Sequence, residues 1–194
     1  MFAKTADKIT QNLKENNAID DEHYEICRYG LQQGLSILLN VFTTIVIGIT
    51  LGMLWQAVLF TALYIPLRSN AGGYHAKTAV QCYFYSVLLI ITVLLAIKYI
   101  TIPNFICIIT LLISIIVITI LAPVEDQNKP LDDIEKYVYR KRTIIIAVIE
   151  GLFLFISMAL NWTQVTLCIT WLVFFMSAIL LIGKVKNRIK SSGI

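Results

Sequence analysis

One histidine and one cysteine stand seven positions apart in a polar, glycine-containing stretch that separates two apolar blocks. His75 is one of only two histidines in the chain, and Cys82 is one of four cysteines. The thiolate is the reactive form of cysteine, and a free thiol is mostly protonated at neutral pH, so a neighbouring imidazole must take or hold its proton. The pair therefore predicts covalent catalysis, with Cys82 as the nucleophile and His75 as the base.

Three other residues of this stretch have types that could assist such a reaction. Asn70 is the nearest amide in the sequence that could orient the imidazole. Arg68 could hold a peptide carboxylate or stabilise a developing oxyanion. Gly73, with Gly72 before it, would let the backbone approach a substrate closely or adopt a positive φ. The competing interpretation is an ordinary turn followed by a helix with a buried cysteine.

The spacing of the pair restricts the backbone between its members. Seven residues of straight α-helix would separate His75 from Cys82 by about 10.5 Å along the axis, which is too far for a hydrogen bond. We therefore predict that the helix containing Cys82 begins after His75 or is broken near Ala79, so that the histidine folds back towards the cysteine. Pairing across a subunit interface is the second possibility.

The other cysteines predict no comparable chemistry. Cys107 and Cys168 lie within apolar segments, where a cysteine usually acts as a small hydrophobic side chain. Cys27 has only His23 and Glu25 as possible partners nearby. The sequence contains no CxxC pair, so it indicates neither a disulfide framework nor a zinc site, and we expect no metal and no cofactor.

The composition is that of a membrane protein. Hydrophobic residues make up 58% of the chain and charged residues 14%, whereas soluble domains carry about 25% charged residues. No Lys, Arg, Asp or Glu occurs between Arg28 and Arg68, an interval long enough for two spans. We predict an all-α, polytopic integral membrane protein, a single membrane domain over residues 1–194, with about six transmembrane helices. The predicted spans are 31–47, 51–66, 80–98, 104–122, 143–160 and 164–182.

The distribution of cations predicts the orientation. Apart from Lys98, every Lys and Arg lies in the amino-terminal segment, in the connections 67–79 and 123–142, or in the carboxyl-terminal tail. Six spans put these four segments on one face, which the positive-inside bias assigns to the cytoplasm. We therefore expect a multi-pass protein of the cell membrane with both termini cytoplasmic, and Lys98 at the opposite boundary.

The first segment, residues 1–30, is polar but contains apolar residues at helical spacing. Phe2, Ala6, Ile9 and Leu13 recur three to four positions apart. We expect a short amphipathic helix that lies on the cytoplasmic membrane surface. A helix packed on the protein's own loops is the alternative.

The stretch from Arg68 to Cys82 resembles the signature of the accessory gene regulator protein B (AgrB) family. The residues that match at the family's spacing are Arg68, Asn70, Ala71, Gly73, His75, Ala76, Lys77 and Cys82. The pairs Ala122-Pro123 and Lys129-Pro130 resemble the family's loop after the fourth span. The resemblance extends over the whole chain, with its polar start, its spans and its basic tail.

This resemblance implies a membrane-embedded cysteine endopeptidase of peptide quorum sensing in Gram-positive bacteria. In the family, the matching cysteine attacks an AgrD propeptide, expels an acidic carboxyl-terminal tail and holds the remainder as a thioester. An internal thiol or hydroxyl of the peptide then closes a thiolactone or lactone ring, the autoinducing peptide. Carried over, Cys82 would carry the acyl group and His75 would act as base and later as acid. The implied partners are an AgrD-like propeptide, the lipid bilayer and a second copy in a homodimer, with no nucleic acid.

Basic residues of the connection after the fourth predicted span could attract such an acidic tail. They are Lys129, Lys136, Arg140, Lys141 and Arg142. They could equally determine the topology beside anionic lipid headgroups.

The residues alone leave two other functions open. A small peptide transporter or exporter is suggested by the spans and by Glu150, the only carboxylate inside a predicted span. A structural membrane subunit without catalysis would leave Cys82 an inert core residue. A transporter would tolerate Cys82→Ser and lose activity with Glu150→Gln, whereas a peptidase would lose activity with Cys82→Ser.

Overall fold

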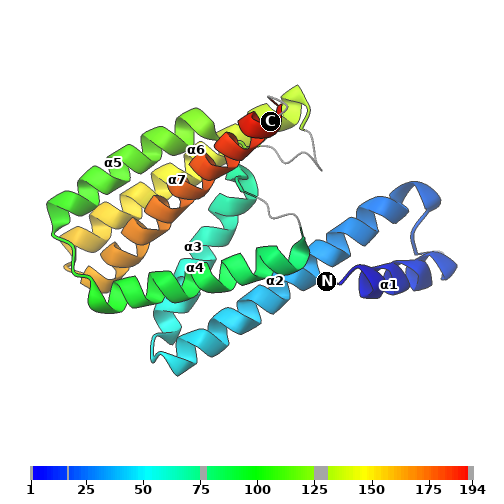
Figure 1. Cartoon of the computed structure of the whole chain (residues 1–194), viewed down its shortest axis with the longest axis horizontal. Coiled ribbons are helices and arrows are strands. Elements are labelled where there is room, and N and C mark those ends of the chain that lie inside the picture. Colours follow the sequence, from blue (N-terminus) through cyan, green and yellow to red (C-terminus); the bar gives the residue numbers. More distant parts are fainter. Residues whose placement is uncertain (1, 17, 75–77, 125–130, 192–194) are drawn as a thin grey trace.

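The computed structural model describes residues 2–16, 18–74, 78–124 and 131–191. Within these ranges the chain forms seven α-helices and no strand, which confirms the predicted all-α class (Figure 1). The helices are α1 (Ala3–Glu15), α2 (Asp21–Thr50), α3 (Leu54–Ala71), α4 (Ala79–Tyr99), α5 (Asn104–Leu121), α6 (Asp133–Ala159) and α7 (Thr163–Ser191).

Each predicted span corresponds to one helix from α2 to α7. Among the described residues, five helices are long and apolar enough to cross a membrane, namely α2, α4, α5, α6 and α7. The predicted span 51–66 forms α3, but α3 is not among the five, because Gln56, Arg68 and Asn70 reduce the apolar character of its 18 residues. The chain is therefore an all-α polytopic membrane protein in which one less apolar helix packs among the others.

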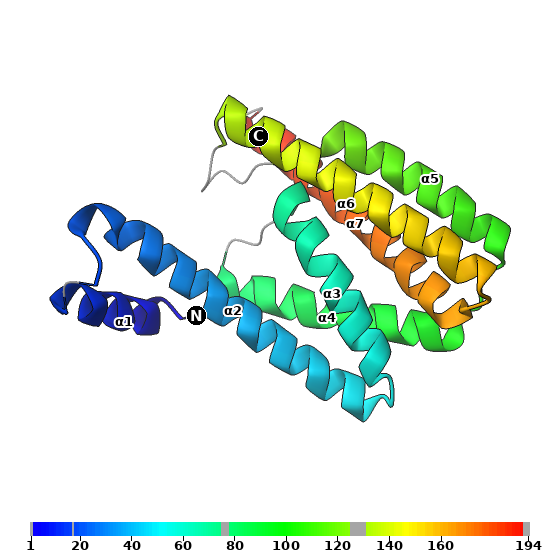
Figure 2. The ribbon, with the colours of Figure 1, turned by 180° about the vertical axis from the view of Figure 1, so that it is seen from behind.

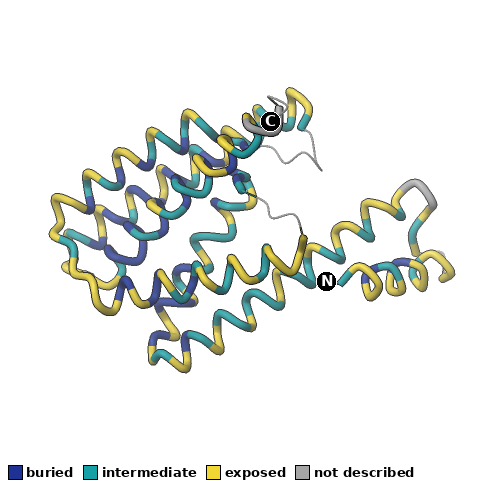
Figure 3. Tube along the Cα trace, in the orientation of Figure 1, coloured by how far each residue is buried: buried dark blue, intermediate teal, exposed yellow. Residues whose placement is uncertain are grey.

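The central helix of the bundle is α7. It lies beside α5 and α6 (Figures 1 and 2) and also packs against α3 and α4. In its most apolar part 56% of the residues are buried, against 6% for α2, which packs mainly against α1, α3 and α4. Figure 3 shows the same contrast between the buried interior of the bundle and the exposed α2. Lipid therefore has access to most of the apolar surface of α2.

The connections alternate between two ends of the bundle. At one end, the backbone that follows α3 is bonded to Val124, just after α5, and to Ile179 in the second half of α7. At the other end, Lys98 of α4 donates a hydrogen bond to the Leu51 carbonyl between α2 and α3, at 3.3 Å. Lys98 thus lies at the opposite end from the basic residues near the ends of α3 and α7, as the up-and-down order of the predicted spans requires.

The predicted amino-terminal helix is α1, which stands to one side of the bundle and packs on the first turns of α2 (Figure 1). Ala6 is buried in this contact, and Tyr24 donates a hydrogen bond to Asp7 at 3.0 Å. The partner of α1 in the chain is thus α2 and not the loops. Residues 21–30, which the prediction placed in the amino-terminal segment, form the first turns of α2 and are continuous with the predicted span 31–47.

Candidate active site

Cys82 lies in the first turn of α4. The helix begins at Ala79 and is capped by Thr78, whose side-chain oxygen accepts a hydrogen bond from the Gln81 N–H at 3.2 Å. The prediction that this helix begins after His75 is therefore confirmed. The Cys82 thiol is free and half-buried. A regular helical turn thus holds a thiol that a reagent or substrate can reach.

Thr78→Ala should loosen the turn that carries this thiol. Loss of an amino-terminal cap costs about 1 kcal/mol, which corresponds to a change of about fivefold in the opening of the turn. We expect faster alkylation of Cys82 by iodoacetamide, measured by mass spectrometry, because a frayed turn exposes the half-buried sulfur. Thr78→Ser keeps the hydroxyl and should react at the wild-type rate. Equal rates in the two variants would show that the cap does not hold the turn.

Two side chains of α3 lie at this end of the bundle, one helical turn apart. Arg68 donates one hydrogen bond to the Gly72 carbonyl and another to the Tyr74 carbonyl, the second at 2.6 Å. Tyr64 has Arg68 and Cys82 as ionisable neighbours. Sequence reasoning missed Tyr64 because it stands in an apolar block. Its position four residues before Arg68, on the same helix face, is the signal that could have found it.

The backbone after α3 forms what we call the strap, defined as Gly72, Gly73 and Tyr74. Gly72 has a φ of 69° and Gly73 a φ of 123°. The Gly73 N–H donates to the Val124 carbonyl at 3.3 Å, and the Val124 N–H donates to the Ala71 carbonyl at 3.0 Å. A β-carbon on Gly72 would collide with the Val124 carbonyl. The close backbone approach expected at the two glycines is thus made to the protein's own chain.

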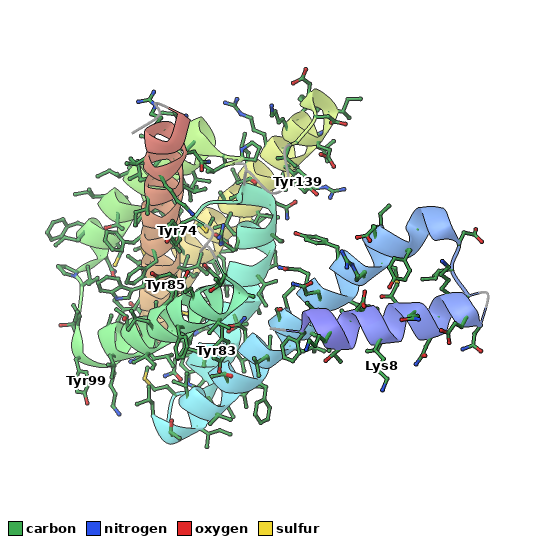
Figure 4. All side chains as sticks on the ribbon, turned by 45° about the vertical axis from the view of Figure 1, so that its right-hand side comes forward. Lys8, Tyr74, Tyr83, Tyr85, Tyr99 and Tyr139 are labelled. Carbon is green, nitrogen blue, oxygen red and sulfur yellow. The ribbon has the colours of Figure 1, made fainter. Side chains whose placement is uncertain are left out.

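Tyr74 fixes the far end of the strap between α4 and α7. Its ring meets the ring of Tyr85 edge-on, with the centroids 5.9 Å apart, and Figure 4 shows the two side chains next to each other. The Lys186 Nζ lies 4.4 Å from the centre of the Tyr74 ring, and the Tyr74 N–H donates to the Ile179 carbonyl at 3.3 Å. The contact with Tyr85 brings the strap beside the turn of α4 that follows Cys82.

The predicted supporting residues are only partly brought together. Asn70 uses its side-chain nitrogen to donate to the Pro66 carbonyl of its own helix, at 2.8 Å. His75 and Lys129 lie outside the described residues. The pairing of His75 with Cys82 and its orientation by Asn70 therefore stay predictions.

A cavity of about 360 Å³ opens between the end of α5 and the first turns of α6. Lys136, Tyr137 and Arg140 line it from α6, and its α5 side extends to Pro123. The next residue, Val124, is the one that is bonded to the strap. The cavity thus presents two cationic side chains and an aromatic ring close to the strap.

The interior of the bundle holds a carboxyl group as well. Glu150 lies well inside α6, with 1% of its surface exposed, and neither side-chain oxygen has a hydrogen-bond partner among the described residues. Cys107 and Cys168 are buried. Within the described ranges, no group of three or more His, Cys, Asp or Glu side chains could hold a metal ion.

Known proteins resemble this chain along most of its length. A family model described as accessory gene regulator B matches residues 6–181. The accessory gene regulator protein B of Staphylococcus saprophyticus is 29% identical over 160 residues, which are 80% of each chain. That of Staphylococcus carnosus is 27% identical over 161 residues, 81% of each chain. A putative AgrB-like protein of Clostridium perfringens is 23% identical over 177 residues, 85% of this chain and 83% of that protein. No solved structure matches the chain.

Proposed function

The chain belongs to the accessory gene regulator B family, and from this premise we propose that it is a membrane-embedded cysteine endopeptidase that matures a signalling peptide. Membership of the family supports a role in accessory gene regulator quorum sensing. The proposed substrate is an AgrD-like propeptide. The enzyme would cleave it at the carboxyl side of the future signal and help to close the ring.

The observation that carries this proposal is the environment of Cys82. Its free, half-buried side chain lies in the first turn of α4, and Tyr64 of α3 has both Cys82 and Arg68 as ionisable neighbours. The strap, which leads directly into His75, passes beside the next turn of α4 through the contact of Tyr74 with Tyr85. Acyl transfer requires a nucleophile, a base and hydrogen-bond donors within a few ångströms of one another. Cys82 and the donors Tyr64 and Arg68 lie at this end of the bundle, and the proposed base follows the strap in the sequence.

In the proposed first step, His75 takes the thiol proton and the Cys82 sulfur attacks the carbonyl carbon of the scissile bond. The C–N bond breaks, His75 gives the proton to the leaving amine, and the carboxyl-terminal tail departs. The remaining peptide is then bound to Cys82 as a thioester. Negative charge develops on the carbonyl oxygen during the attack, and the Tyr64 hydroxyl is a donor that could stabilise it.

In the proposed second step, an internal thiol or hydroxyl of the peptide attacks the thioester carbonyl. The C–S bond to Cys82 breaks, the proton of the attacking group returns to the sulfur through His75, and a thiolactone or lactone ring forms. Exchange of one thioester for another changes the free energy little, so water must be kept from the site during this step. The buried Gly73 and the half-buried Tyr74 support such exclusion.

Arg68 is proposed to hold the strap and not a substrate carboxylate. Its guanidinium donates to the carbonyls of both Gly72 and Tyr74. A β-carbon on Gly73 would lie only 2.9 Å from the Nη1 atom of the same side chain, so the strap passes directly over Arg68. A guanidinium has five N–H groups, and those that remain could assist Tyr64 at the oxyanion.

The acidic tail of the propeptide is proposed to bind at the cavity between α5 and α6. Lys136 and Arg140 line this cavity. Lys129, Lys141 and Arg142 would add to the positive field that attracts the tail. By the positive-inside bias, we assign this end of the bundle and both termini to the cytoplasmic side of the cell membrane. A second copy of the chain is the proposed partner in a homodimer.

Arg140→Gln removes one of the two cations that line the cavity. We expect the KM for the propeptide to rise about tenfold with kcat little changed, because attraction of the tail acts on binding and not on the reaction at Cys82. The effect should shrink as salt is added, since salt screens exposed charges. Arg142→Gln is the matched comparison and should raise KM less, because Arg142 is exposed on the same helix and adds to the field but does not line the cavity. An equal rise in KM for both variants would show that net charge, and not the cavity, attracts the tail.

The proposed function is tested by incubating the purified protein in lipid vesicles with a synthetic AgrD-like propeptide. We expect peptide mass spectrometry to find an acyl adduct on Cys82, together with release of the carboxyl-terminal fragment. Cys27→Ala should keep both, since Cys27 is likewise free and half-buried. A propeptide that binds but is neither attached nor cleaved would contradict the peptidase. Transport would then be the better candidate, and the buried Glu150 the residue to replace.

A further inference from the structure

The strap is held by α7, a helix that sequence reasoning did not connect with the reaction. The Tyr74 N–H donates to the Ile179 carbonyl at 3.3 Å, and the Lys186 Nζ lies 4.4 Å from the centre of the Tyr74 ring. A β-carbon on Gly73 would also lie 2.9 Å from the side chain of Ile179. Both the backbone and the ring of the strap are therefore fixed against the same part of α7.

The closest approach is made at Gly183. A β-carbon there would lie 2.7 Å from the Tyr74 nitrogen and 2.8 Å from the Gly73 carbonyl carbon. Both are backbone atoms, so no side chain could turn aside to make room. Glycine is less favourable than alanine inside a helix, and it is expected there only where another group must come very near. Gly183 is therefore the residue that lets the strap lie directly on α7.

The three residues of α7 share one face of the helix. Ile179, Gly183 and Lys186 stand at positions i, i+4 and i+7, which follow one another along a single side of an α-helix. The first supplies a backbone acceptor, the second the space for close contact, and the third a cation over the aromatic ring. Together they form a surface that matches the strap in shape and in chemistry.

We propose that Ile179, Gly183 and Lys186 are positioning residues that set the strap beside Cys82 for acyl transfer. This inference rests on the proposed function, because the strap leads directly into the proposed base. A displacement of about 1 Å in a catalytic arrangement can lower a rate by about 100-fold without weakening binding. The contact of the strap with Ile179, Gly183 and Lys186 therefore controls the rate of acylation and not the affinity for the propeptide.

Gly183→Ala is the first test, carried out on the full chain in lipid vesicles. We expect acylation of Cys82 by the propeptide to slow about 100-fold with an unchanged KM. Gly151→Ala is the matched control, because Gly151 is also inside a helix but a β-carbon there meets only side-chain atoms at 3.5 Å or more. It should acylate at the wild-type rate. Thermal unfolding of both variants shows whether the change at Gly183 acts on the site or on the whole fold.

Lys186 provides a second test that leaves the backbone contact in place. Lys186→Met removes the cation above the Tyr74 ring, whereas Lys186→Arg keeps a cation that also stacks on aromatic faces. We expect slower acylation in the methionine variant and recovery in the arginine variant. Charge alone cannot explain that pattern if Lys184→Met, which removes a cation next to Gly183 in the sequence, acylates normally.

Alkylation of Cys82 by iodoacetamide without any propeptide separates failure of this inference from failure of the proposed function. Displacement of the strap should change the alkylation rate in Gly183→Ala and in Lys186→Met but not in Gly151→Ala. If the wild type alkylates but never acylates, the proposed function fails, and the alkylation rates alone decide whether α7 positions the strap. Wild-type alkylation and acylation rates in a folded Gly183→Ala protein would overturn the inference.

Discussion

Cys82→Ala is expected to abolish the acyl adduct and to lower propeptide cleavage by roughly 10⁴-fold or more, as removal of a catalytic nucleophile does in other covalent enzymes. Without the sulfur no thioester can form, so release of the tail and ring closure are lost together. The measurement is the rate of appearance of the carboxyl-terminal fragment by quenched mass spectrometry. Cys82→Ala should still bind the propeptide. Cleavage that survives in this variant would remove Cys82 from the reaction.

In His75→Ala we expect acylation of Cys82 to slow about 10²- to 10⁴-fold, which is the usual contribution of a general base. Added imidazole should restore part of the rate, because it can take the thiol proton in place of the missing side chain. The matched control is His23→Ala, since His23 is the other histidine and is exposed at the start of α2. Mixing the His75→Ala and Cys82→Ala chains in one dimer tests where the pair forms. Recovered activity would refute pairing within one chain.

Gly72→Ala is expected to detach the strap from Val124 and to slow acylation about 100-fold. Gly72 has a φ of 69°, in the left-handed region, where a residue with a β-carbon is strained by about 1–2 kcal/mol. The β-carbon would in addition collide with the Val124 carbonyl. The bonds of Val124 to Ala71 and Gly73 would then be lost or displaced. The acylation rate and the unfolding temperature measure the two effects.

Gly52→Ala is the control that distinguishes backbone strain from the collision with the Val124 carbonyl as the cause of the effect of Gly72→Ala. Gly52 has a φ of 68°, almost the value at Gly72, but nothing lies within 4 Å of the position of its β-carbon. It stands in the connection between α2 and α3, at the opposite end of the bundle from the strap. Alanine there should lower the unfolding temperature and leave the acylation rate intact. If Gly72→Ala and Gly52→Ala lowered the acylation rate equally, the hydrogen bonds between the strap and Val124 would have no part in the reaction.

The helices could be predicted because lipid imposes simple rules on the chain. The uncharged interval from Arg28 to Arg68 had to form two helices, since only a helix satisfies its own backbone groups in lipid. The polar stretch from Arg68 to Cys82 was also visible, because its charged and polar residues and its two glycines interrupt the apolar pattern. The length of α2 was not predictable from apolar character alone, because its first turns are polar and pack on α1.

The surroundings of the strap could not be predicted, because they depend on contacts between residues far apart in the sequence. In the sequence, Val124 looks like an ordinary loop residue. Gly183, just after the predicted span 164–182, carries no sign of a close contact. From the sequence, Tyr64 could equally face lipid or the core, because its proximity to Cys82 depends on how α3 packs beside α4. Arg68 was selected from the sequence for its chemistry, but its partners, the carbonyls of Gly72 and Tyr74, appear only when the backbone turns over it.

The central position of α7 has a consequence for biosynthesis. Among the seven described helices it is the last to leave the ribosome. It nevertheless packs against α3, α4, α5 and α6, and its residues Ile179, Gly183 and Lys186 hold the strap. A nascent chain that has inserted only its first six helices therefore contains Cys82 but lacks the Ile179 carbonyl and the Lys186 cation that hold Tyr74 against α7. The proposed peptidase activity would begin only when α7 enters the membrane. Truncation within α7 would abolish the proposed activity while every residue from Arg68 to Cys82 is still present.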